Sequence, residues 1–464
     1  MNTILAPLRE LGEYEDIQKQ LNTQQGKVSI SGCVDSQKLH MVYGLTEKYD
    51  VKLIVTYSDM KAKELLDDCK LYCRESYYFP AKDLIFYQAD IHSNQLIKER
   101  VAVLRKLLEG EPITIVTTFS ALMAHQLPLS VWQENVIEIE EGGIAEEAAI
   151  ARQLVKMGYE KNYQVEAPGQ FSVRGGIVDI FDLTRENPVR IELWGDEVES
   201  IRSFDIESQR SIEKLTEVSI YPATELILSK KALEDGLARM EKDCKKSAAF
   251  FREETKPEEA HRLEQAVAEL KEQVTQFQSF VNLESYIGYF YEETQSLVDF
   301  VADRKLCICL DEPARIEEHA NAVELEFRES MSTRAEKGYI LPEQMNVLYG
   351  AKEIYARLDK NRLLALSTME YKGFPVKFQN RYAVNARNVS SYNNSFPELV
   401  KDLNHYKKNG YRVLLVSASS TRAKRLATDL MDEGLNAFYS DNSQRELQPG
   451  EIMTFYGNVL KGFE

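Results

Sequence analysis

The chain of 464 residues lacks the features that mark membrane and secreted proteins. It contains no run of about 18 apolar residues, so the sequence predicts no membrane-spanning helix and no membrane partner. Its first residues, MNTILAPLRELGEYED, have neither the basic end nor the long apolar core of a secretory signal peptide. These absences predict a cytoplasmic protein.

Cysteine and histidine are also scarce. The six cysteines match neither a disulfide framework nor the paired CxxC spacing of a zinc site. Cys69 and Cys73 would share one helix face, but no nearby histidine completes a site, so buried free thiols are the better interpretation. The six histidines are scattered, and no GxSxG elbow or HExxH helix is present. We expect no metal and no catalytic residues of these types.

Basic residues are fewer than acidic residues. Lysine and arginine number 57 against 74 aspartates and glutamates, which gives a net charge of −17. Strong duplex binding requires neutralisation of phosphates, so a chain this acidic, without a long basic run, is a poor stand-alone DNA binder. A protein partner is the better expectation.

The N-terminal part of the sequence predicts strands that alternate with helices. Between residues 27 and 118, the strand-like runs VSIS, VKLIVTY and ITIVTTF alternate with helical stretches around Lys61 to Cys73 and Asn94 to Leu108. This pattern is typical of an α/β domain with a parallel sheet.

Further along, the composition becomes helical. Apolar residues recur at spacings of four, three, four and three residues, which predicts one core-facing side of a helix: Leu263, Val267, Leu270, Val274 and Phe277. The apolar run LCICL predicts a strand, and VEL and MNVLYG suggest more β/α units. From about Arg381, YRVLLVS, a helix over 420–433 and the strand NAFYS predict a small separate α/β domain.

The stretch after VSIS, GCVDSQKL, has the outline of a phosphate-binding loop but not its chemistry. Such a loop needs glycines for a nest of backbone amides, a lysine for the phosphates and a hydroxyl for magnesium. Gly32 and Lys38 keep the expected separation, but Gln37 replaces the second glycine and Leu39 replaces the hydroxyl. Asp35 adds a carboxylate where phosphates would lie. We therefore expect a degenerate loop that neither binds nor hydrolyses ATP, and no cofactor.

Asp311 and Glu312 follow the LCICL strand and resemble the acidic motif that positions magnesium and water in nucleotide-driven motors. Without a hydroxyl at position 39, this motif has no metal to share. Charge at a helix N-terminus, or pairing with a neighbour, is the simpler interpretation.

Residues 168–210 predict two strand pairs that form an antiparallel sheet. Gln170 to Arg174 alternates polar and apolar residues, Gly175-Gly176 supplies a turn, and Ile177 to Phe181 follows. A second pair begins with Arg190 to Trp194, whose turn is Gly195-Asp196. The side-chain period of two places Ile191, Leu193 and Val173 on a buried face.

The opposite, solvated face would carry Arg174, Arg190 and Trp194, which are residue types that anchor protein interfaces. Because these side chains point away from the core, we expect their replacement by alanine to change stability little. An alternative stays open at this point: Trp194 could lie flat over its own sheet, with Arg190 paired to Glu192 or another carboxylate.

The runs FSVRGGIVDIFDL and NPVRIELWGDEVESIRSFD, followed by SQRS, closely resemble the second domain of the bacterial transcription-repair coupling factors, the Mfd family. The resemblance extends over essentially the whole chain. It implies that the first part is a module related to the excision-repair subunit UvrB, and that the second domain binds UvrA through Arg174, Arg190 and Trp194. The aromatic residue is commonly Phe in the family. UvrB itself keeps an intact loop and a long tyrosine-rich hairpin, whereas Lys82 to Gln95 is too short for one.

The resemblance also implies the fold class and the domain boundaries. A degenerate, helicase-like parallel-sheet core spans residues 1–125 and 221–379, an antiparallel β-rich UvrA-binding domain is inserted at 126–220, and a small α/β domain occupies 380–464. The chain stops at GNVLKGFE, where family members continue into a polymerase-binding domain and an ATP-driven DNA translocase. RNA polymerase and DNA would then be contacted only through those absent regions.

The function implied is recruitment without catalysis: the chain would bind UvrA and bring excision repair to a stalled RNA polymerase. Two other functions remain open. The chain could be an ATP-dependent repair enzyme of UvrB type, or a structural module that holds the absent motor domains inactive through the second domain. ATP turnover would identify the enzyme, and UvrA binding separates recruitment from the structural role.

Overall fold

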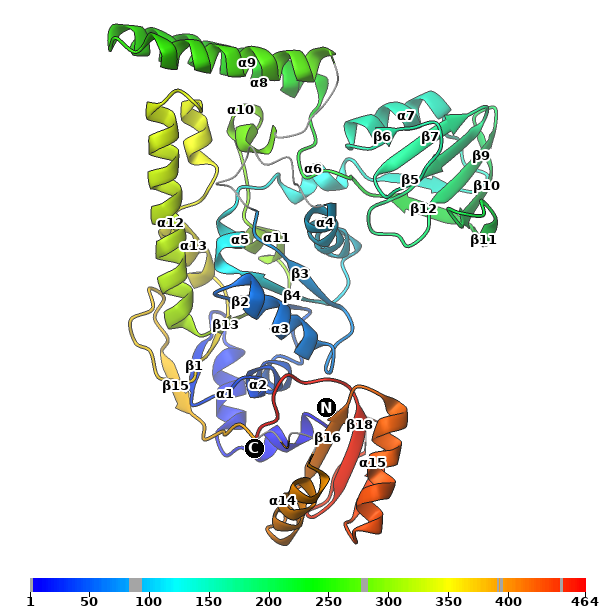
Figure 1. The fold of residues 1–464 in the computed structure, drawn as a ribbon, viewed down its shortest axis with the longest axis vertical. Coiled ribbons are helices and arrows are strands. Elements are labelled where there is room, and N and C mark those ends of the chain that lie inside the picture. Colours follow the sequence, from blue (N-terminus) through cyan, green and yellow to red (C-terminus); the bar gives the residue numbers. More distant parts are fainter. Residues whose placement is uncertain (1–2, 83–93, 277–282, 390–391, 393–394, 443–444) are drawn as a thin grey trace.

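The computed structural model describes residues 3–82, 94–276, 283–389, 392, 395–442 and 445–464. Within them, a parallel sheet of seven strands forms the core (Figure 1). Its strands, in spatial order, are β15 (Asn380–Ala383), β1 (Lys27–Ser31), β14 (Leu363–Leu366), β13 (Leu306–Asp311), β2 (Val51–Thr56), β4 (Ile113–Thr118) and β3 (Ser76–Phe79). Strands from before and after the inserted domain are interleaved, because β14 and β13 lie between β1 and β2.

Helices cover both faces of the core sheet, as all-parallel sheets require. One face packs against α1 (Tyr14–Leu21), α2 (Gln37–Leu45) and α3 (Asp59–Cys69). The other face packs against α4 (Asn94–Glu109), α5 (Phe119–Met123), α11 (Leu297–Val301), α12 (Pro313–Glu336) and α13 (Ala351–Asp359). The central strands are therefore buried on both sides, and β4 and β13 are buried at every position.

The inserted domain is a six-stranded sheet that projects from one side of the core (Figure 1). Its strands, in order, are β11 (Ser211–Leu215), β10 (Glu197–Phe204), β9 (Val189–Trp194), β8 (Ile177–Ile180), β7 (Gln170–Arg174) and β6 (Glu160–Lys161). Only the β6–β7 pair is parallel. The inner face packs on α7 (Glu147–Lys156) and on the two-stranded sheet of β5 (Ile137–Glu140) and β12 (Glu217–Ile220).

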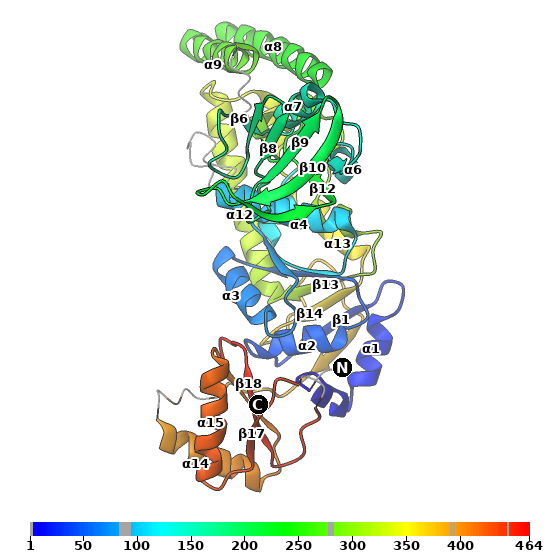
Figure 2. The same cartoon turned by 90° about the vertical axis from the view of Figure 1, so that its right-hand side faces the viewer.

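Two further units lie at the ends of the molecule (Figure 2). Helices α8 (Lys230–Glu253) and α9 (Pro257–Gln276) pack together at one end. At the other end, β16 (Val413–Ser417), β18 (Ile452–Tyr456) and β17 (Ala437–Tyr439) form a parallel sheet with α14 (Phe396–Lys408) and α15 (Ser420–Asp432). The predicted fold class is confirmed: a parallel-sheet core, an inserted antiparallel domain and a small α/β domain.

Several element predictions can now be compared with the structure. The stripe at Leu263, Val267, Leu270 and Val274 is buried on one side of α9, whereas Phe277 lies outside the described residues. The predicted strand at VEL is wrong, because residues 323–325 lie inside α12. MNVLYG is also not a strand: it covers the end of a 3-10 helix and the turn into α13. Runs this short cannot distinguish a strand from a helix by periodicity.

The expectation that Lys82 to Gln95 lacks a hairpin insertion falls mainly on residues 83–93, which are outside the described residues. In the part of the chain that is described, no helix is both long and apolar enough to cross a membrane.

Candidate functional site

The outward face of the inserted sheet carries the three residues predicted for docking. Strand β9 alternates between buried and less buried positions, so Ile191 and Leu193 enter the core while Arg190 and Trp194 face outward. Arg174 ends β7, the second strand across. The predicted buried face is confirmed, with Val173 partly buried against the same cluster.

Asp179 of β8 brings the two arginines together. Arg190 donates from Nε to Oδ1 (2.7 Å) and from Nη2 to Oδ2 (2.8 Å), and Arg174 donates from Nη2 to Oδ2 (3.0 Å). The Asp179 side chain is only 1% exposed, so its charge depends on these partners. A forked guanidinium–carboxylate pair fixes Arg190 in one orientation.

The two arginines differ in side-chain exposure and in the number of their partners. Arg190 is 16% exposed, lies over the Phe204 ring at 4.4 Å and also donates to Gln209 Oε1 (3.0 Å). The hydrogen bonds to Asp179 raise the pKa of Arg190. Arg174 is 37% exposed and approaches the ring of the exposed Tyr163 at 5.9 Å. Arg190 is thus part of the framework, whereas Arg174 keeps donors facing solvent.

Trp194 stands apart from both arginines. It is 79% exposed, at the end of β9 before Gly195, whose φ of 63° makes the turn. Four residues at about 3.3 Å each place it roughly 13 Å along the strand from Arg190. Glu192 lies between them and pairs with Arg202 of β10. The face therefore consists of an arginine pair at one end and a free indole at the other.

The simpler interpretation of this face is half right. Arg190 does pair with a carboxylate, although the partner is Asp179 rather than Glu192. Trp194 does not lie flat on its sheet, because a packed ring would not be 79% exposed.

The structure also revises the expected effect on stability. Removing Arg190 would leave the buried Asp179 charge with only Arg174, so Arg190→Ala is not neutral. The sequence analysis did not identify Asp179. A usable signal was present, because Asp179 is a charged residue inside an apolar strand, and the hairpin register places it opposite Arg190.

The degenerate loop and the acidic motif meet at the end of the core sheet. Lys38 Nζ donates to Asp311 Oδ1 (2.7 Å) and to Glu312 Oε1 (2.6 Å), and its side chain is 6% exposed. Burial by itself would lower the pKa of Lys38, but the two carboxylates outweigh it and raise the pKa. Thr56 Oγ1 donates to Asp311 Oδ2 (2.8 Å). The lysine that would meet phosphates is neutralised by the protein itself.

Several backbone amides of the loop also have partners within the protein. The amides of Gly32 and Cys33 donate to the carbonyls of Thr368 and Ser367, and the Val34 amide donates to Gln37 Oε1 (3.4 Å). Leu39, at the hydroxyl position, is 1% exposed. These amides therefore do not form an open nest.

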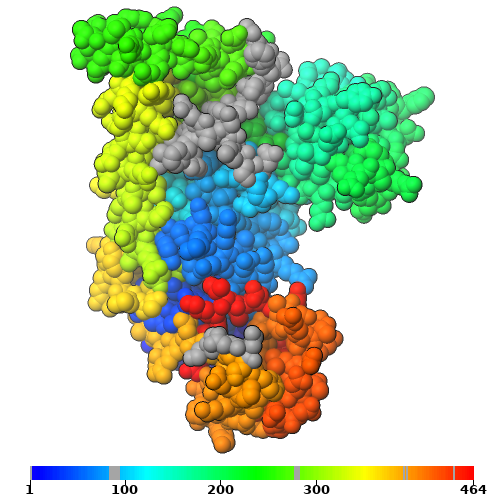
Figure 3. Space-filling view, viewed as in Figure 1, coloured from blue at the N-terminus to red at the C-terminus, as the bar shows by residue number. Residues whose placement is uncertain are grey.

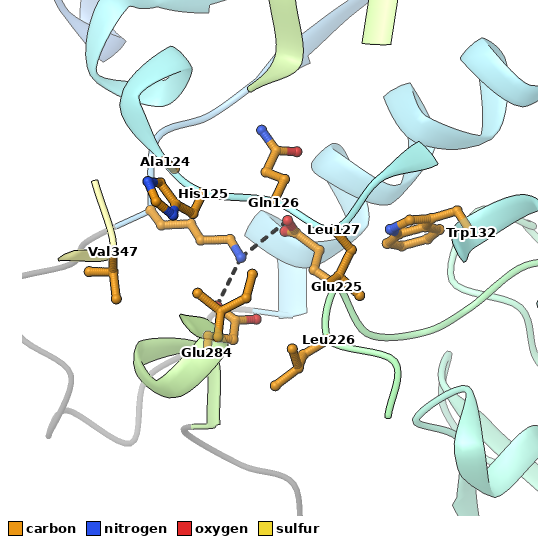
Figure 4. Close-up of a pocket in the computed structure, with 11 residues that line it drawn as sticks. Ala124, His125, Gln126, Leu127, Trp132, Glu225, Leu226, Glu284 and Val347 are labelled. Atoms are coloured by element: carbon orange, nitrogen blue, oxygen red, sulfur yellow. Dashed lines mark ion pairs between the residues drawn. The ribbon is translucent and has the colours of Figure 1, made fainter. Parts of the chain in front are cut away.

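A small cavity lies where the inserted domain rejoins the core (Figure 4). It measures about 20 Å³, which has room for a water molecule. Lys82 bridges Glu225 (3.1 Å) and Glu284 (3.0 Å), the two dashed contacts in Figure 4. Arg100, which is fully buried, donates to both oxygens of Glu225. This network fastens the exit of the inserted domain to the core.

Metal-ligating side chains do not gather elsewhere: across the described ranges, no group of three or more His, Cys, Asp or Glu residues has the arrangement to hold a metal ion.

Comparison with known proteins agrees with this organisation. The family model of the UvrB interaction domain matches residues 137–226, the inserted domain. The chain is 31% identical, over its whole length, to the transcription-repair-coupling factor of Bacillus subtilis, and 25% and 26% identical to those of Staphylococcus epidermidis and Staphylococcus haemolyticus over 95% and 94% of its length. It spans 37–39% of the length of these relatives. The chain is therefore similar to the transcription-repair coupling factors along its whole length, and residues 137–226 match the UvrB interaction domain.

Proposed function

We propose that the chain binds UvrA through the outward face of the inserted sheet, with Arg174, Arg190 and Trp194 at the centre of the contact. The observation that carries this proposal is the arrangement of the face: Asp179 holds two arginines in place, and an exposed indole lies farther along the same face. Arginine and tryptophan are the residue types that dominate binding energy at protein interfaces. Because the two arginines are already held in one orientation, less conformational entropy is lost when they bind a partner.

The three residues have different roles in this proposal. Trp194 supplies apolar area that is exposed before binding and desolvated afterwards. Arg174 supplies the free donors for a carboxylate of the partner. Arg190 is a positioning residue, because its guanidinium is already engaged by Asp179 and Gln209. The face carries Arg174, Arg190 and Arg202 together with Asp179, Glu192 and Glu197, so its charges are mixed, and the half-exposed Arg174 is the cation best placed to meet a carboxylate of the partner.

The role of the longer relatives extends the proposal to the whole protein. Bound UvrA would bring excision repair to a stalled RNA polymerase, and an ATP-driven translocase elsewhere in the full-length protein would contact DNA and polymerase. This chain would contribute recruitment without catalysis. The ion pairs of Lys38 with Asp311 and Glu312 disfavour the alternative of a UvrB-type ATP-dependent enzyme.

The tryptophan content of the chain provides a direct test. There are two tryptophans: Trp132 is buried in the core and Trp194 is exposed. We would label the chain with 5-fluorotryptophan and add unlabelled UvrA while recording fluorine NMR spectra. The Trp194 resonance should shift on binding, and the Trp132 resonance should keep its position. Binding with both resonances unmoved would contradict the proposed face.

A further inference from the structure

The segment that leads from the core to the small α/β domain and the segment that follows its last strand, β18, run side by side. The Arg387 amide donates to the Glu464 carbonyl, and the Glu464 amide donates back to the Arg387 carbonyl, each at 2.9 Å. The Val389 amide donates to the Gly462 carbonyl (2.9 Å). We refer to residues 384–389 and 457–464 together as the tether ribbon. Its C-terminal residues, in red, lie between the core and the small domain in Figure 3.

The tether ribbon lies on the degenerate loop. Asp35, the residue that places a carboxylate in the loop, accepts hydrogen bonds from Lys461 Nζ (2.9 Å) and Asn388 Nδ2 (2.9 Å). Both segments of the ribbon are thus attached to one side chain. Burial by itself would raise the pKa of Asp35, but the hydrogen bonds from Lys461 and Asn388 and the charge of Lys461 outweigh it and lower the pKa.

A second set of contacts fastens the backbone of the ribbon. The Leu460 amide donates to Asp68 Oδ1 (2.7 Å), and the Lys461 amide donates to Ser36 Oγ (3.2 Å). Ser36 in turn donates to Asp68 Oδ2 (2.6 Å), and both side chains are buried. Asp68 therefore connects α3, the loop and the ribbon.

The packing requires glycine at one crossing and is close at a second. A Cβ on Gly32 would lie 2.0 Å from the Val384 carbonyl oxygen, and its φ is 79°. A Cβ on Gly457 would lie 2.6 Å from the Leu71 side chain. The Phe463 ring also approaches the ring of His40, with centroids 5.5 Å apart.

We propose that the degenerate loop at residues 32–39 is a docking site for the tether ribbon, and that this docking, in place of a nucleotide, sets the position of the small α/β domain on the core. The replacement of the loop's phosphate chemistry by Asp35 then has a function of its own. Two other contacts join the small domain to the core: Arg412 forms a forked pair with Glu10, and Thr3 Oγ1 donates to the Arg445 carbonyl. The inference does not depend on UvrA binding.

Reversing the charges at Asp35 and Lys461 tests the docking. Hydrogen exchange at residues 457–464, followed by mass spectrometry, should be about tenfold faster or more in Asp35→Lys and in Lys461→Asp, because each places like charges together. The Asp35→Lys/Lys461→Asp double variant should recover much of the protection. Lys408→Asp, on the exposed end of α14, makes the same charge change away from the ribbon and should leave the exchange unchanged. Exchange in β2 and β13 reports whether each variant is folded.

Three results would overturn the docking. The first is that the single variants are folded yet exchange at residues 457–464 like the wild type. The second is that the double variant exchanges as fast as the faster single variant. The third is that millimolar ATP with magnesium slows exchange in residues 32–39, since the ribbon and the closed loop leave no place for a nucleotide.

Discussion

At the scale of single residues, the surface at the centre of this account depends on one buried carboxylate. Asp179 accepts three hydrogen bonds from two arginines, so a residue with almost no exposed area decides how the exposed residues are presented. In the proposed interface, Arg190 would contribute to both stability and binding, whereas Arg174 and Trp194 would contribute mainly to binding.

Arg190→Ala should therefore lower the free energy of unfolding by about 3 kcal/mol, because it leaves a buried charge short of its main partner. Arg174→Ala removes one hydrogen bond from a half-exposed side chain and should cost roughly 1 kcal/mol or less. Urea denaturation of the two variants checks the difference. Equal small losses would show that Asp179 does not depend on Arg190.

His125 gives a pH dependence whose sign can be derived. Burial lowers the pKa of His125 from 6.5 to about 4, beside Tyr349, whose ring centroid is 4.0 Å away. Between these values the unfolded chain binds the proton and the folded chain does not, so stability should fall as the pH drops from about 6.5 through 4. Below pH 4 this contribution changes no further.

His125→Gln should flatten that part of the stability profile relative to the wild type, measured by denaturant unfolding at pH 7, 6, 5 and 4. His261→Gln, on the exposed side of α9, is the matched control and should leave the profile as it is. An unchanged profile in His125→Gln would show that other groups carry the pH dependence.

At the scale of elements, alternation was the most informative signal in the sequence. It predicted strand β7 at its observed bounds and β9 within one residue, together with their buried and exposed sides, because an antiparallel sheet with one solvated face follows the period of two. The β14 strand was not predicted: Leu363–Leu366 is four apolar residues long and fully buried, so it has no alternation. The contact of Lys38 with Asp311 and Glu312 depends on strand order, which local patterns do not specify.

The closed loop leads to a prediction about nucleotides. Titration of ATP with magnesium into the chain should give no binding heat at micromolar to millimolar concentrations. Lys38 is neutralised by two carboxylates, and the position of the magnesium-binding hydroxyl is the buried Leu39. Micromolar affinity in calorimetry would contradict this.

At the scale of the whole molecule, the inserted domain and the small domain attach to the core in different ways. The inserted domain leaves and rejoins a sheet whose strands come from both sides of the insertion, and the Lys82–Glu225–Glu284 network secures its exit. The small domain contacts the core through the tether ribbon and through the pairs Arg412–Glu10 and Thr3–Arg445. In Figure 1 the inserted domain projects from one side of the core, and the small domain lies at one end of the molecule.

The acidic charge of the whole chain predicts poor binding to nucleic acid. With a net charge of −17, the chain should bind duplex DNA weakly, without sequence preference, and with an affinity that salt abolishes. A gel-shift experiment over a range of salt concentrations checks this. Nanomolar, salt-resistant retention of a duplex would be the contrary result.

Calorimetric titration of purified UvrA into the wild-type chain and into Arg174→Ala/Trp194→Ala tests the central claim most directly. The double variant keeps the Asp179–Arg190 pair, so its melting temperature should stay close to that of the wild type. Its affinity for UvrA should fall at least thirtyfold, or about 2 kcal/mol, as expected for loss of interface hot spots. Leu193→Ala should show the reverse, a lower melting temperature with UvrA affinity retained, because it removes buried volume from the inner face. A double variant that binds UvrA as tightly as the wild type would contradict the account.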